Sequence, residues 1–354
     1  MSLKNGIPMS TRDLISAAEV GNLDEVKTVL ETEVDINVTD ENGSSALLSA
    51  ARNGKVDVVR LLLEKGADYN KTDKEEDTPL IVAATEGHIE VVRVLLESGD
   101  DIEKTSKDGN TPLIRAAQRG QLDVIQLLLG KGAKVNNRNI HGSTALLWAA
   151  DQGYLEIVEF LEKNGGVIDQ PTNYGITPLM SAAQNGHVDV VQFLLEKGDD
   201  VQKTDDDGYT AICWAAGNDH LEVLLLENGA AIDQTTEDGF TSLIWASQEG
   251  RLEVVRLLLD NGADLEKTYD GGFRALDAAA QTGNVDVVEA LLQGEAHVDA
   301  VSDDGSTALL LAAMLGYLET VETLVSHGAS IDLPDIEKQN DLGGYAIAGC
   351  CGWR

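Results

Sequence analysis

The sequence is short of cysteine, and it lacks both an apolar leader and a long hydrophobic run. Its 354 residues include three cysteines, Cys213, Cys350 and Cys351, of which two are adjacent. This number and spacing exclude the disulfide framework of a small secreted domain. Residues 1–10 have no apolar core of a signal peptide, and no apolar run approaches the roughly 20 residues that cross a membrane. We therefore expect a reducing, intracellular compartment, the cytoplasm with the nucleus as an open alternative, and no membrane insertion.

Aromatic and positively charged residues are also scarce. Aromatic residues make up 4% of a chain that is 43% hydrophobic, so Ala, Val and Leu must fill the core of closely packed helices. The 26 Lys and Arg residues stand against 61 Asp and Glu residues, for a net charge of −35. Such a surface repels nucleic acid and anionic lipid, and we expect neither as a partner. It attracts basic or Lys/Arg-rich peptides, or alternatively serves only to keep a long chain soluble.

A short segment recurs along the chain at a nearly constant interval. It occurs as Thr78-Pro79-Leu80, Thr111-Pro112-Leu113, Thr144-Ala145-Leu146, Thr177-Pro178-Leu179, Thr210-Ala211-Ile212, Thr241-Ser242-Leu243 and Thr307-Ala308-Leu309, with weaker copies starting at residues 12, 45 and 274. The interval is 33 residues, except for 31 residues between Thr210 and Thr241. Such a period is typical of a repeat architecture. It gives ten windows from residue 12 to residue 339 and the beginning of another at 340–354.

Each part of a window predicts a structural element. The Thr precedes an apolar run and can cap a helix, and Pro suits the first helical position that follows. A pair of small residues such as Ala83-Ala84 lets neighbouring helices approach, and a Gly such as Gly87 ends the helix. A second helix follows, for example over residues 88–96, and it also ends on Gly. The rest carries turn residues, so each window predicts helix, turn, helix and an extended hairpin.

The pattern D-x-x-G-x-T-P-L-x-x-A-A-x-x-G-H-x-x-x-V-x-x-L-L-x-x-G-A-D resembles the ankyrin repeat. The resemblance implies an all-α solenoid of stacked helix-turn-helix pairs with β-hairpin loops, which form a curved right-handed stack with a concave binding face. Residues 1–11 are then an N-terminal extension and residues 12–44 a capping repeat. Nine further repeats occupy residues 45–339, and residues 340–354 form a truncated repeat or tail. This apolar end is either the edge of a fragment or a surface for a partner.

Several windows depart from the family pattern. The repeat at 210–240 has Asp219 in place of the capping Gly, and its second helix is two residues short. We expect a shortened helix or a local bend near residues 217–230, with neutral drift in one repeat as the alternative. Glu76 and Lys338 replace the hairpin Gly, which predicts distorted tips. The His of the family's T-P-L-H motif is replaced by Leu48, Ile81, Ile114, Leu147, Met180, Cys213, Ile244, Asp277 and Leu310, which predicts mostly apolar contacts there.

The sequence offers no catalytic or metal-binding constellation. His88, His187 and His220 occupy the same repeat position, the first of the second helix, so we interpret them as structural. The remaining histidines have no partner at ligand spacing, and the phosphate-binding, hydrolase, zinc-protease and kinase signatures are absent. The run Asp205-Asp206-Asp207 is interpreted as a solvated tip rather than as a cation site. We therefore expect no enzyme, no cofactor and no metal.

The resemblance implies that contacts come from the hairpin tips and the exposed side of the first helix. Aromatic residues at these positions concentrate in the middle of the chain: Trp148, Tyr174, Tyr209, Trp214, Phe240, Trp245 and Phe273. Carboxylates accompany them, and the candidates are Asp206, Asp207 and Asp238. Aromatic anchors with a polar rim are typical of binding hot spots, and acidic neighbours favour a basic partner. The alternative is that these rings only pack between hairpins.

The sequence therefore predicts a protein-interaction scaffold or adaptor. The alternative is the targeting or substrate-recruiting arm of a larger protein, such as a kinase or a ubiquitin ligase. The oligomeric state is left open.

Overall fold

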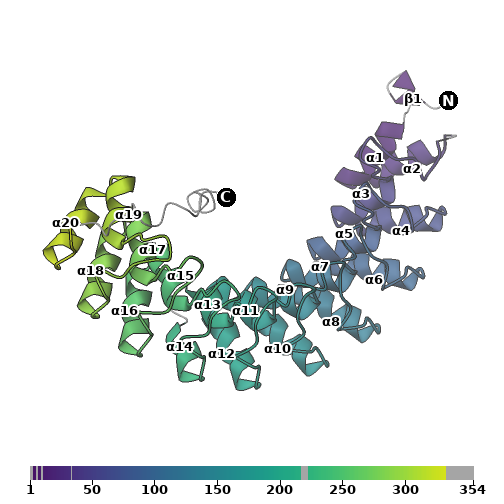
Figure 1. The fold of residues 1–354 in the computed structure, drawn as a ribbon. Coiled ribbons are helices and arrows are strands. Elements are labelled where there is room, and N and C mark those ends of the chain that lie inside the picture. Colours follow the sequence, from purple (N-terminus) through teal and green to yellow (C-terminus); the bar gives the residue numbers. More distant parts are fainter. Residues whose placement is uncertain (1–2, 5–6, 9–10, 33, 217–221, 332–354) are drawn as a thin grey trace. The chain divides into compact units, whose positions relative to one another are not determined.

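The computed structural model describes residues 3–4, 7–8, 11–32, 34–216 and 222–331, and it divides into two units, Met1–Pro178 and Leu179–Arg354. Each described repeat contributes two antiparallel helices, and a hairpin leads to the next repeat (Figure 1). Two short strands, β1 (Leu3–Lys4) and β2 (Ile7–Pro8), pair antiparallel before the first helix. The expected all-α solenoid with hairpin loops is confirmed.

In the first unit, the first helices of the repeats are α1 (Thr11–Val20), α3 (Ala46–Arg52), α5 (Pro79–Glu86), α7 (Pro112–Gln118) and α9 (Ala145–Asp151). The second helices are α2 (Leu23–Leu30), α4 (Val56–Glu64), α6 (Ile89–Glu97), α8 (Leu122–Gly130) and α10 (Leu155–Lys163). Each first helix packs on the next first helix and on its own second helix, which forms two parallel rows.

The second unit repeats this order. Its first helices are α11 (Pro178–Gln184), α13 (Ala211–Ala215), α15 (Ser242–Gln248), α17 (Ala275–Thr282) and α19 (Ala308–Leu315). Its second helices are α12 (Val188–Glu196), α14 (Glu222–Glu227), α16 (Leu252–Asp260), α18 (Val285–Gln293) and α20 (Leu318–Ser326).

The predicted caps define the helix ends. The hydroxyl of Thr78 accepts a hydrogen bond from the backbone N–H of Ile81 at 3.2 Å, and Pro79 takes the first helical position. Gly87 then ends α5 in the left-handed conformation, with φ of 79°. The second helix begins one residue later than predicted, because His88 is its N-cap rather than its first residue. The repeat pattern therefore locates these helices to within one residue.

Small and aliphatic side chains fill the core, as the low aromatic content predicts. Ala83 and Ala84 are fully buried on α5, so the neighbouring first helices can approach closely. Leu48, Ile81 and Ile114, which stand where the family motif has His, are also fully buried. The predicted apolar contact at this position is thus confirmed for most repeats. Asp277 is the polar exception, and its carboxylate accepts the backbone N–H of Arg274 to cap α17.

The irregular repeat has short helices in its described part. Helix α13 has five residues and α14 has six, whereas α15 and α16 have seven and nine. The cap of α13 is also unusual, because Thr210 donates its hydroxyl to the Cys213 sulfur at 3.4 Å instead of accepting a backbone N–H. The expected shortening of the second helix is not tested, because α14 begins at the first residue after the undescribed segment 217–221, which includes Asp219 and part of the bend expected near residues 217–230.

The prediction of a distorted tip at Glu76 is wrong. Glu76 adopts the left-handed conformation of the hairpin Gly, with φ of 59°. Its backbone N–H donates to the Asp73 carbonyl at 3.1 Å, the same distance as the bond from Gly43 to Asp40 in the preceding hairpin. The turn geometry is imposed by the hydrogen bonds around it, so the residue accepts a strained backbone and the tip keeps its shape. Lys338 lies outside the described residues.

The last described helices leave apolar side chains uncovered. Leu318 is 67% exposed, Met314 60% and Leu315 54%, all on α19 or at the start of α20. No helix of the described residues combines the length and the apolar character needed to cross a membrane.

Candidate functional site

A polar side chain at the start of most described hairpins closes the turn. In the first unit, Asp40 Oδ1 accepts the backbone N–H groups of Asn42 and Ser44 at 2.8 and 2.9 Å. In the second unit, Asp205 Oδ1 accepts the N–H of Tyr209 at 2.8 Å. Each carboxylate therefore uses one oxygen for the turn, and its other oxygen remains available to a neighbour.

Consecutive hairpins are joined by backbone rungs within each unit. A rung is one hydrogen bond from a hairpin N–H to a carbonyl of the hairpin before it. The first unit has rungs from Lys74 to Asn42 (3.1 Å), Lys107 to Glu75 (2.9 Å) and Ile140 to Asp108 (3.1 Å). The second unit has rungs from Asp270 to Asp238 (3.0 Å) and Asp303 to Gly271 (2.8 Å). The rungs hold side chains of adjacent hairpins side by side, on the same side as the first helices.

In the second unit these positions assemble a continuous aromatic cluster, the aromatic ladder. It consists of Tyr209, Trp214, Phe240, Trp245, Tyr269 and Phe273. Tyr209 contacts both tryptophans, with ring centroids 5.8 Å from Trp214 and 5.7 Å from Trp245. Phe240 lies 6.2 Å from Trp245 and 4.4 Å from Tyr269, which in turn lies 5.7 Å from Phe273. These separations and tilted orientations are those at which aromatic rings attract one another.

The ladder rings pack on one another and also remain partly open to solvent, since all six residues are half-buried. The predicted packing between hairpins is therefore present, and it leaves part of each residue accessible. Tyr269 was missed by the sequence analysis because it occupies the hairpin's first position, where Asp, Asn or Thr usually closes the turn. The 33-residue register was the signal that could have placed it beside Phe240.

Trp148 and Tyr174 do not join the ladder, because they belong to the first unit. Within the described part of the chain, neither forms a ring pair. Trp148 is half-buried on α9, and its indole Nε1 is buried without a hydrogen-bond partner. Tyr174 is 59% exposed at a hairpin tip. The structure thus brings together five of the seven aromatic residues predicted from the sequence.

Asp205 anchors the ladder rather than forming part of a solvated tip. It is 7% exposed, and its Oδ2 accepts the indole N–H of Trp214 at 3.0 Å. Burial raises the pKa of the carboxyl, while its hydrogen bonds from Tyr209 and Trp214 oppose that shift. The prediction of a solvated tip holds for the other two residues of the run, since Asp206 and Asp207 are exposed.

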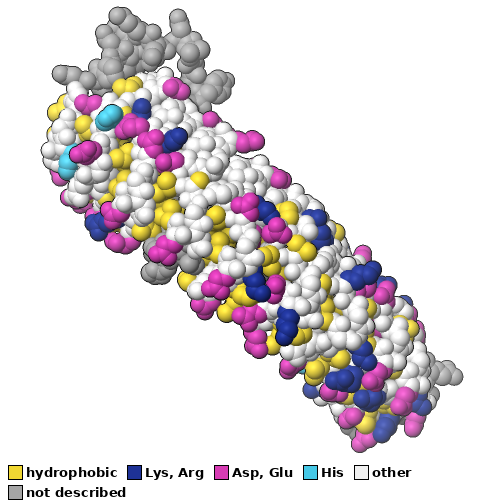
Figure 2. Space-filling view, turned by 90° about the horizontal axis from the view of Figure 1, so that it is seen from below, with side chains coloured by type: hydrophobic (Ala, Val, Ile, Leu, Met, Phe, Trp, Pro, Cys, Tyr) yellow, Lys and Arg dark blue, Asp and Glu magenta, His cyan; other side chains and the backbone are white. Residues whose placement is uncertain are grey.

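The ladder lies in an acidic environment. Asp207 and Asp238 are exposed near Tyr209, and the pKa of that phenol is raised by burial first and then by nearby negative groups, including both carboxylates. The second unit as a whole carries 8 Lys and Arg residues against 32 Asp and Glu residues, whereas the first carries 18 against 29. On the face in Figure 2, Lys and Arg side chains are correspondingly most numerous over the first unit.

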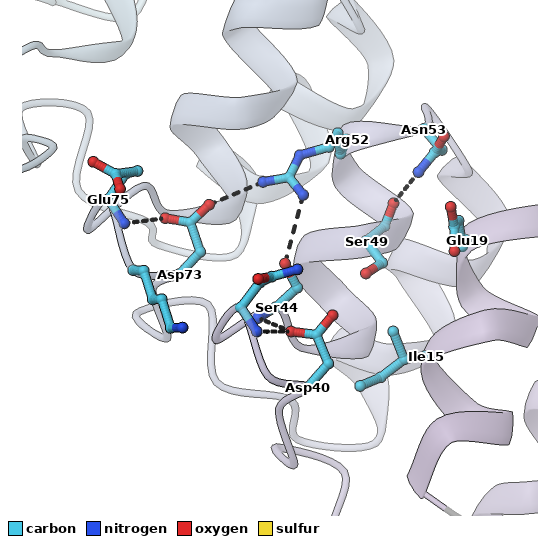
Figure 3. Close-up of a pocket in the computed structure, with 11 residues that line it drawn as sticks. Ile15, Glu19, Asp40, Ser44, Ser49, Arg52, Asn53, Asp73 and Glu75 are labelled. Carbon is cyan, nitrogen blue, oxygen red and sulfur yellow. Dashed lines mark hydrogen bonds and ion pairs between the residues drawn. The ribbon is translucent and has the colours of Figure 1, made fainter.

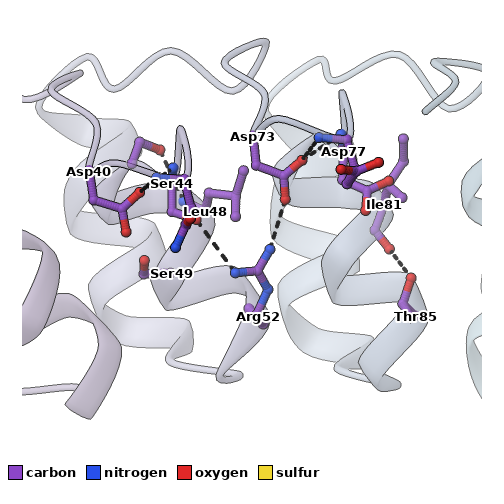
Figure 4. A network of polar contacts seen from close by, with 12 residues as sticks. Asp40, Ser44, Leu48, Ser49, Arg52, Asp73, Asp77, Ile81 and Thr85 are labelled. Carbon is purple, nitrogen blue, oxygen red and sulfur yellow. Dashed lines mark hydrogen bonds and ion pairs between the residues drawn. The ribbon is translucent and has the colours of Figure 1, made fainter. Parts of the chain in front are cut away.

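The first unit has a polar pocket of about 500 Å³, and no aromatic residue lines it. This N-terminal pocket lies between α1, α3 and the hairpins at residues 40–44 and 73–77, and Figure 3 shows its lining. Arg52 reaches from α3 to the next hairpin, where its guanidinium pairs with Asp73 Oδ2 at 2.9 Å and with the Ser44 hydroxyl at 3.5 Å (Figure 4). The pocket's walls are therefore fixed by contacts across two repeats.

The histidine position has a structural role where the structure describes it. The His88 Nε2 lies 2.9 Å from the carbonyl oxygen of Arg52 at the end of the preceding first helix. Gln121 makes the equivalent bond to Thr85, at 3.3 Å. Among the described residues, no group of three or more His, Cys, Asp or Glu side chains could hold a metal ion.

Comparison with known proteins identifies the family of the chain and structures that resemble it. The family model described as "Ankyrin repeats (3 copies)" matches six overlapping segments, residues 14–108, 70–139, 96–171, 136–205, 198–269 and 265–335. The crystal structure of the human ASB11 ankyrin repeat domain is 28% identical, with a TM-score of 0.57 over 62% of this chain and 98% of that chain. The comparison with curated proteins gives no match.

Proposed function

Because the chain belongs to the ankyrin repeat family, whose repeats generally serve as protein-interaction modules, we propose that it is a scaffold or adaptor that binds a Lys/Arg-rich protein segment on the aromatic ladder. The observation that carries this proposal is the continuity of six half-buried rings across consecutive hairpins of an acidic unit. Rings held by their neighbours lose little conformational freedom on binding, which favours affinity.

The chemistry of the ladder supports a basic partner. The face of an indole or phenol ring attracts a Lys or Arg cation, and this attraction grows as water is excluded. The exposed carboxylates of Asp206, Asp207 and Asp238 surround the rings and attract the same cations over a longer range. A need for solubility would explain the acidic surface residues. It would not explain why large aromatic side chains beside them remain partly exposed to solvent.

The test is selection of a peptide and measurement of its affinity. Random peptides displayed on phage are selected on the purified chain, and the Kd of a selected peptide is measured by fluorescence anisotropy. We expect the selected peptides to be enriched in Lys and Arg. We expect the double variant Tyr209→Ala, Trp245→Ala to bind such a peptide about a thousandfold more weakly, since two hot-spot residues that contribute about 2 kcal/mol each remove about 4 kcal/mol.

Two controls separate binding from folding. Trp148→Ala removes the same side chain from the equivalent helix position in the first unit, and we expect it to leave the Kd unchanged. Asp207→Asn with Asp238→Asn removes charge without removing a ring, and we expect the affinity to fall most at low salt. Selection of acidic or uncharged peptides, or a Kd that survives in the folded double variant, would overturn the proposal.

A further inference from the structure

We propose that the N-terminal pocket binds the ammonium or guanidinium head group of a Lys or Arg side chain presented by a partner peptide. This pocket lies in the first unit and shares no residue with the aromatic ladder. The inference rests on the proposed function only in that it takes the partner to be a protein.

Two of the pocket's side-chain donors, those of Arg52 and Asn53, are already engaged. Arg52 directs its guanidinium to Asp73 Oδ2 at 2.9 Å and to Ser44 Oγ at 3.5 Å. Asn53 donates its side-chain N–H to the backbone carbonyl of Ser49 at 2.9 Å. Asp40 Oδ1 is also in use, because it closes the hairpin turn.

The groups that remain free include three acceptors as well as the Lys74 ammonium. Asp40 Oδ2 and the Glu19 carboxylate have no partner among the described residues, and both border the pocket. Ser49 is 93% buried, at 7% exposure, yet its hydroxyl forms no hydrogen bond and opens into the pocket. Figure 3 shows the three side chains around one space. Because the hydroxyl of this largely buried residue faces the pocket, a ligand there can supply the missing hydrogen bond.

An acceptor set of this kind fits a cation with several N–H donors. An ammonium group has three donors and no acceptor, and a guanidinium has five. The lining carries four carboxylates, Glu19, Asp40, Asp73 and Glu75, against the two cations Arg52 and Lys74, so the charge also favours a cation. Ile15, which is 7% exposed, contributes an apolar wall for the aliphatic stem of the side chain.

The proposal is tested on the full chain with small probes. Isoleucine δ1 methyl groups are labelled with ¹³C, and the Ile15 signal is assigned with an Ile15→Val variant. The probes are the Nα-acetyl methylamides of lysine, arginine, norleucine and glutamate. We expect a saturable shift of the Ile15 signal with the lysine or arginine probe and no saturable shift with the neutral or the acidic one.

Matched variants then identify the contacts. Asp40→Asn is expected to weaken binding of the cationic probe about tenfold, because a charged hydrogen bond is lost. The fold should persist, because Asn139 closes the equivalent turn with a carboxamide, accepting N–H groups of His141 and Ser143 at 3.0 and 2.9 Å. Ser49→Ala is expected to weaken binding about threefold. Glu41→Gln, an exposed neighbour outside the pocket, is the control and should change nothing.

Each result that contradicts the proposal has a different meaning. A saturable shift with the acidic probe would mean that Arg52 recognises an anion, and an equal shift with norleucine would mean that only the stem binds. Unchanged affinity in a folded Asp40→Asn variant, or no saturable shift with either cationic probe, would overturn the proposal. None of these results depends on the aromatic ladder, so failure here is separable from failure of the proposed function.

Discussion

Asp100 places a carboxylate at a repeat position that Ala occupies in several other repeats. The equivalent residue is a buried Ala in several other repeats, as at Ala67, Ala230 and Ala263, and a buried Asp in one, Asp199. Asp100 is 6% exposed, and neither of its oxygens meets the geometry of a hydrogen bond, although the nearby Asp101 N–H slightly favours its charged form. Burial raises its pKa from 3.8 to about 7. Between pH 3.8 and about 7 the folded state therefore holds a proton that the unfolded state has already released.

Asp100→Ala is expected to stabilise the chain more at pH 8 than at pH 4. Below pH 3.8 the carboxyl is protonated in both states, so its ionisation has no effect on stability. Between pH 3.8 and about 7 the unfolded state ionises first, so wild-type stability falls as pH rises, and above about 7 the penalty is constant. We expect a gain on the order of 2 kcal/mol at pH 8, measured from urea midpoints. The exposed Asp108→Ala control should show no such pH dependence, and equal gains at both pH values would contradict the assignment.

Glu76 shows backbone strain that a glycine would relieve. Its φ of 59° lies in the left-handed region, which costs a residue with a Cβ about 1–2 kcal/mol. Glu76→Gly is therefore expected to raise stability by about 1 kcal/mol, after allowance for the greater freedom of Gly in the unfolded chain. Thermal unfolding followed by circular dichroism measures the gain. Glu75→Gly, one residue earlier and without positive φ, should lower stability instead.

At the scale of elements, a hairpin and its first helix are joined by side chains as well as by the backbone. Asp205 Oδ1 closes the hairpin while Oδ2 accepts the Trp214 indole, so one carboxylate links the turn to α13. The first unit lacks this link. Asn139 stands in the place of Asp205, and its Nδ2 donates to Asn110 at 2.9 Å, while the Trp148 Nε1 is left without a partner. A single change from carboxylate to carboxamide therefore separates the two cases.

Asp205→Asn is expected to destabilise the second unit by about 1–2 kcal/mol. Its oxygen can still close the turn, but the amide nitrogen then faces another donor, the Trp214 N–H. In a Trp214→Phe background the same change should have little effect, because the donor is gone. A double-mutant cycle from urea unfolding measures the coupling. Equal costs in both backgrounds would show that the bond to Trp214 contributes nothing.

The sequence predicted elements better than it predicted contacts between them. Thr78 and Gly87 mark the ends of α5 through local hydrogen bonds and local φ, which a single repeat determines. The bond from Trp214 to Asp205 depends on the relative position of a hairpin and a helix nine residues apart. Tyr269 joins the ladder because a rung places its hairpin beside that of Phe240. Such contacts depend on packing geometry, which residue type and spacing do not specify.

At the scale of the whole molecule, the acidic charge is unevenly divided between the two units. The second unit has 32 acidic against 8 basic residues, so repulsion within it exceeds that within the first. We expect salt to have two opposite effects. An increase of NaCl from about 0.05 to about 0.5 M should stabilise the folded second unit and weaken its binding of a basic peptide, because both repulsion and attraction are screened.

Tryptophan fluorescence can follow the two units separately. Variants that keep only Trp148 report on the first unit, and variants that keep only Trp245 report on the second. We expect the thermal midpoint reported by Trp245 to rise more with salt than that reported by Trp148. Equal shifts would mean that the uneven charge has no effect on stability.

The rungs between hairpins have a mechanical consequence. Among the described residues of each unit, every such bond joins a hairpin only to the hairpin before it, and no rung spans several repeats. Under tension applied to its two ends, a unit is therefore expected to yield from an edge, one repeat after another, rather than in a single rupture. Each event should release 33 residues, about 110 Å of extended chain. A force spectrometer would record this behaviour as a regular saw-tooth, and the chain would act as a spring that lengthens in equal steps.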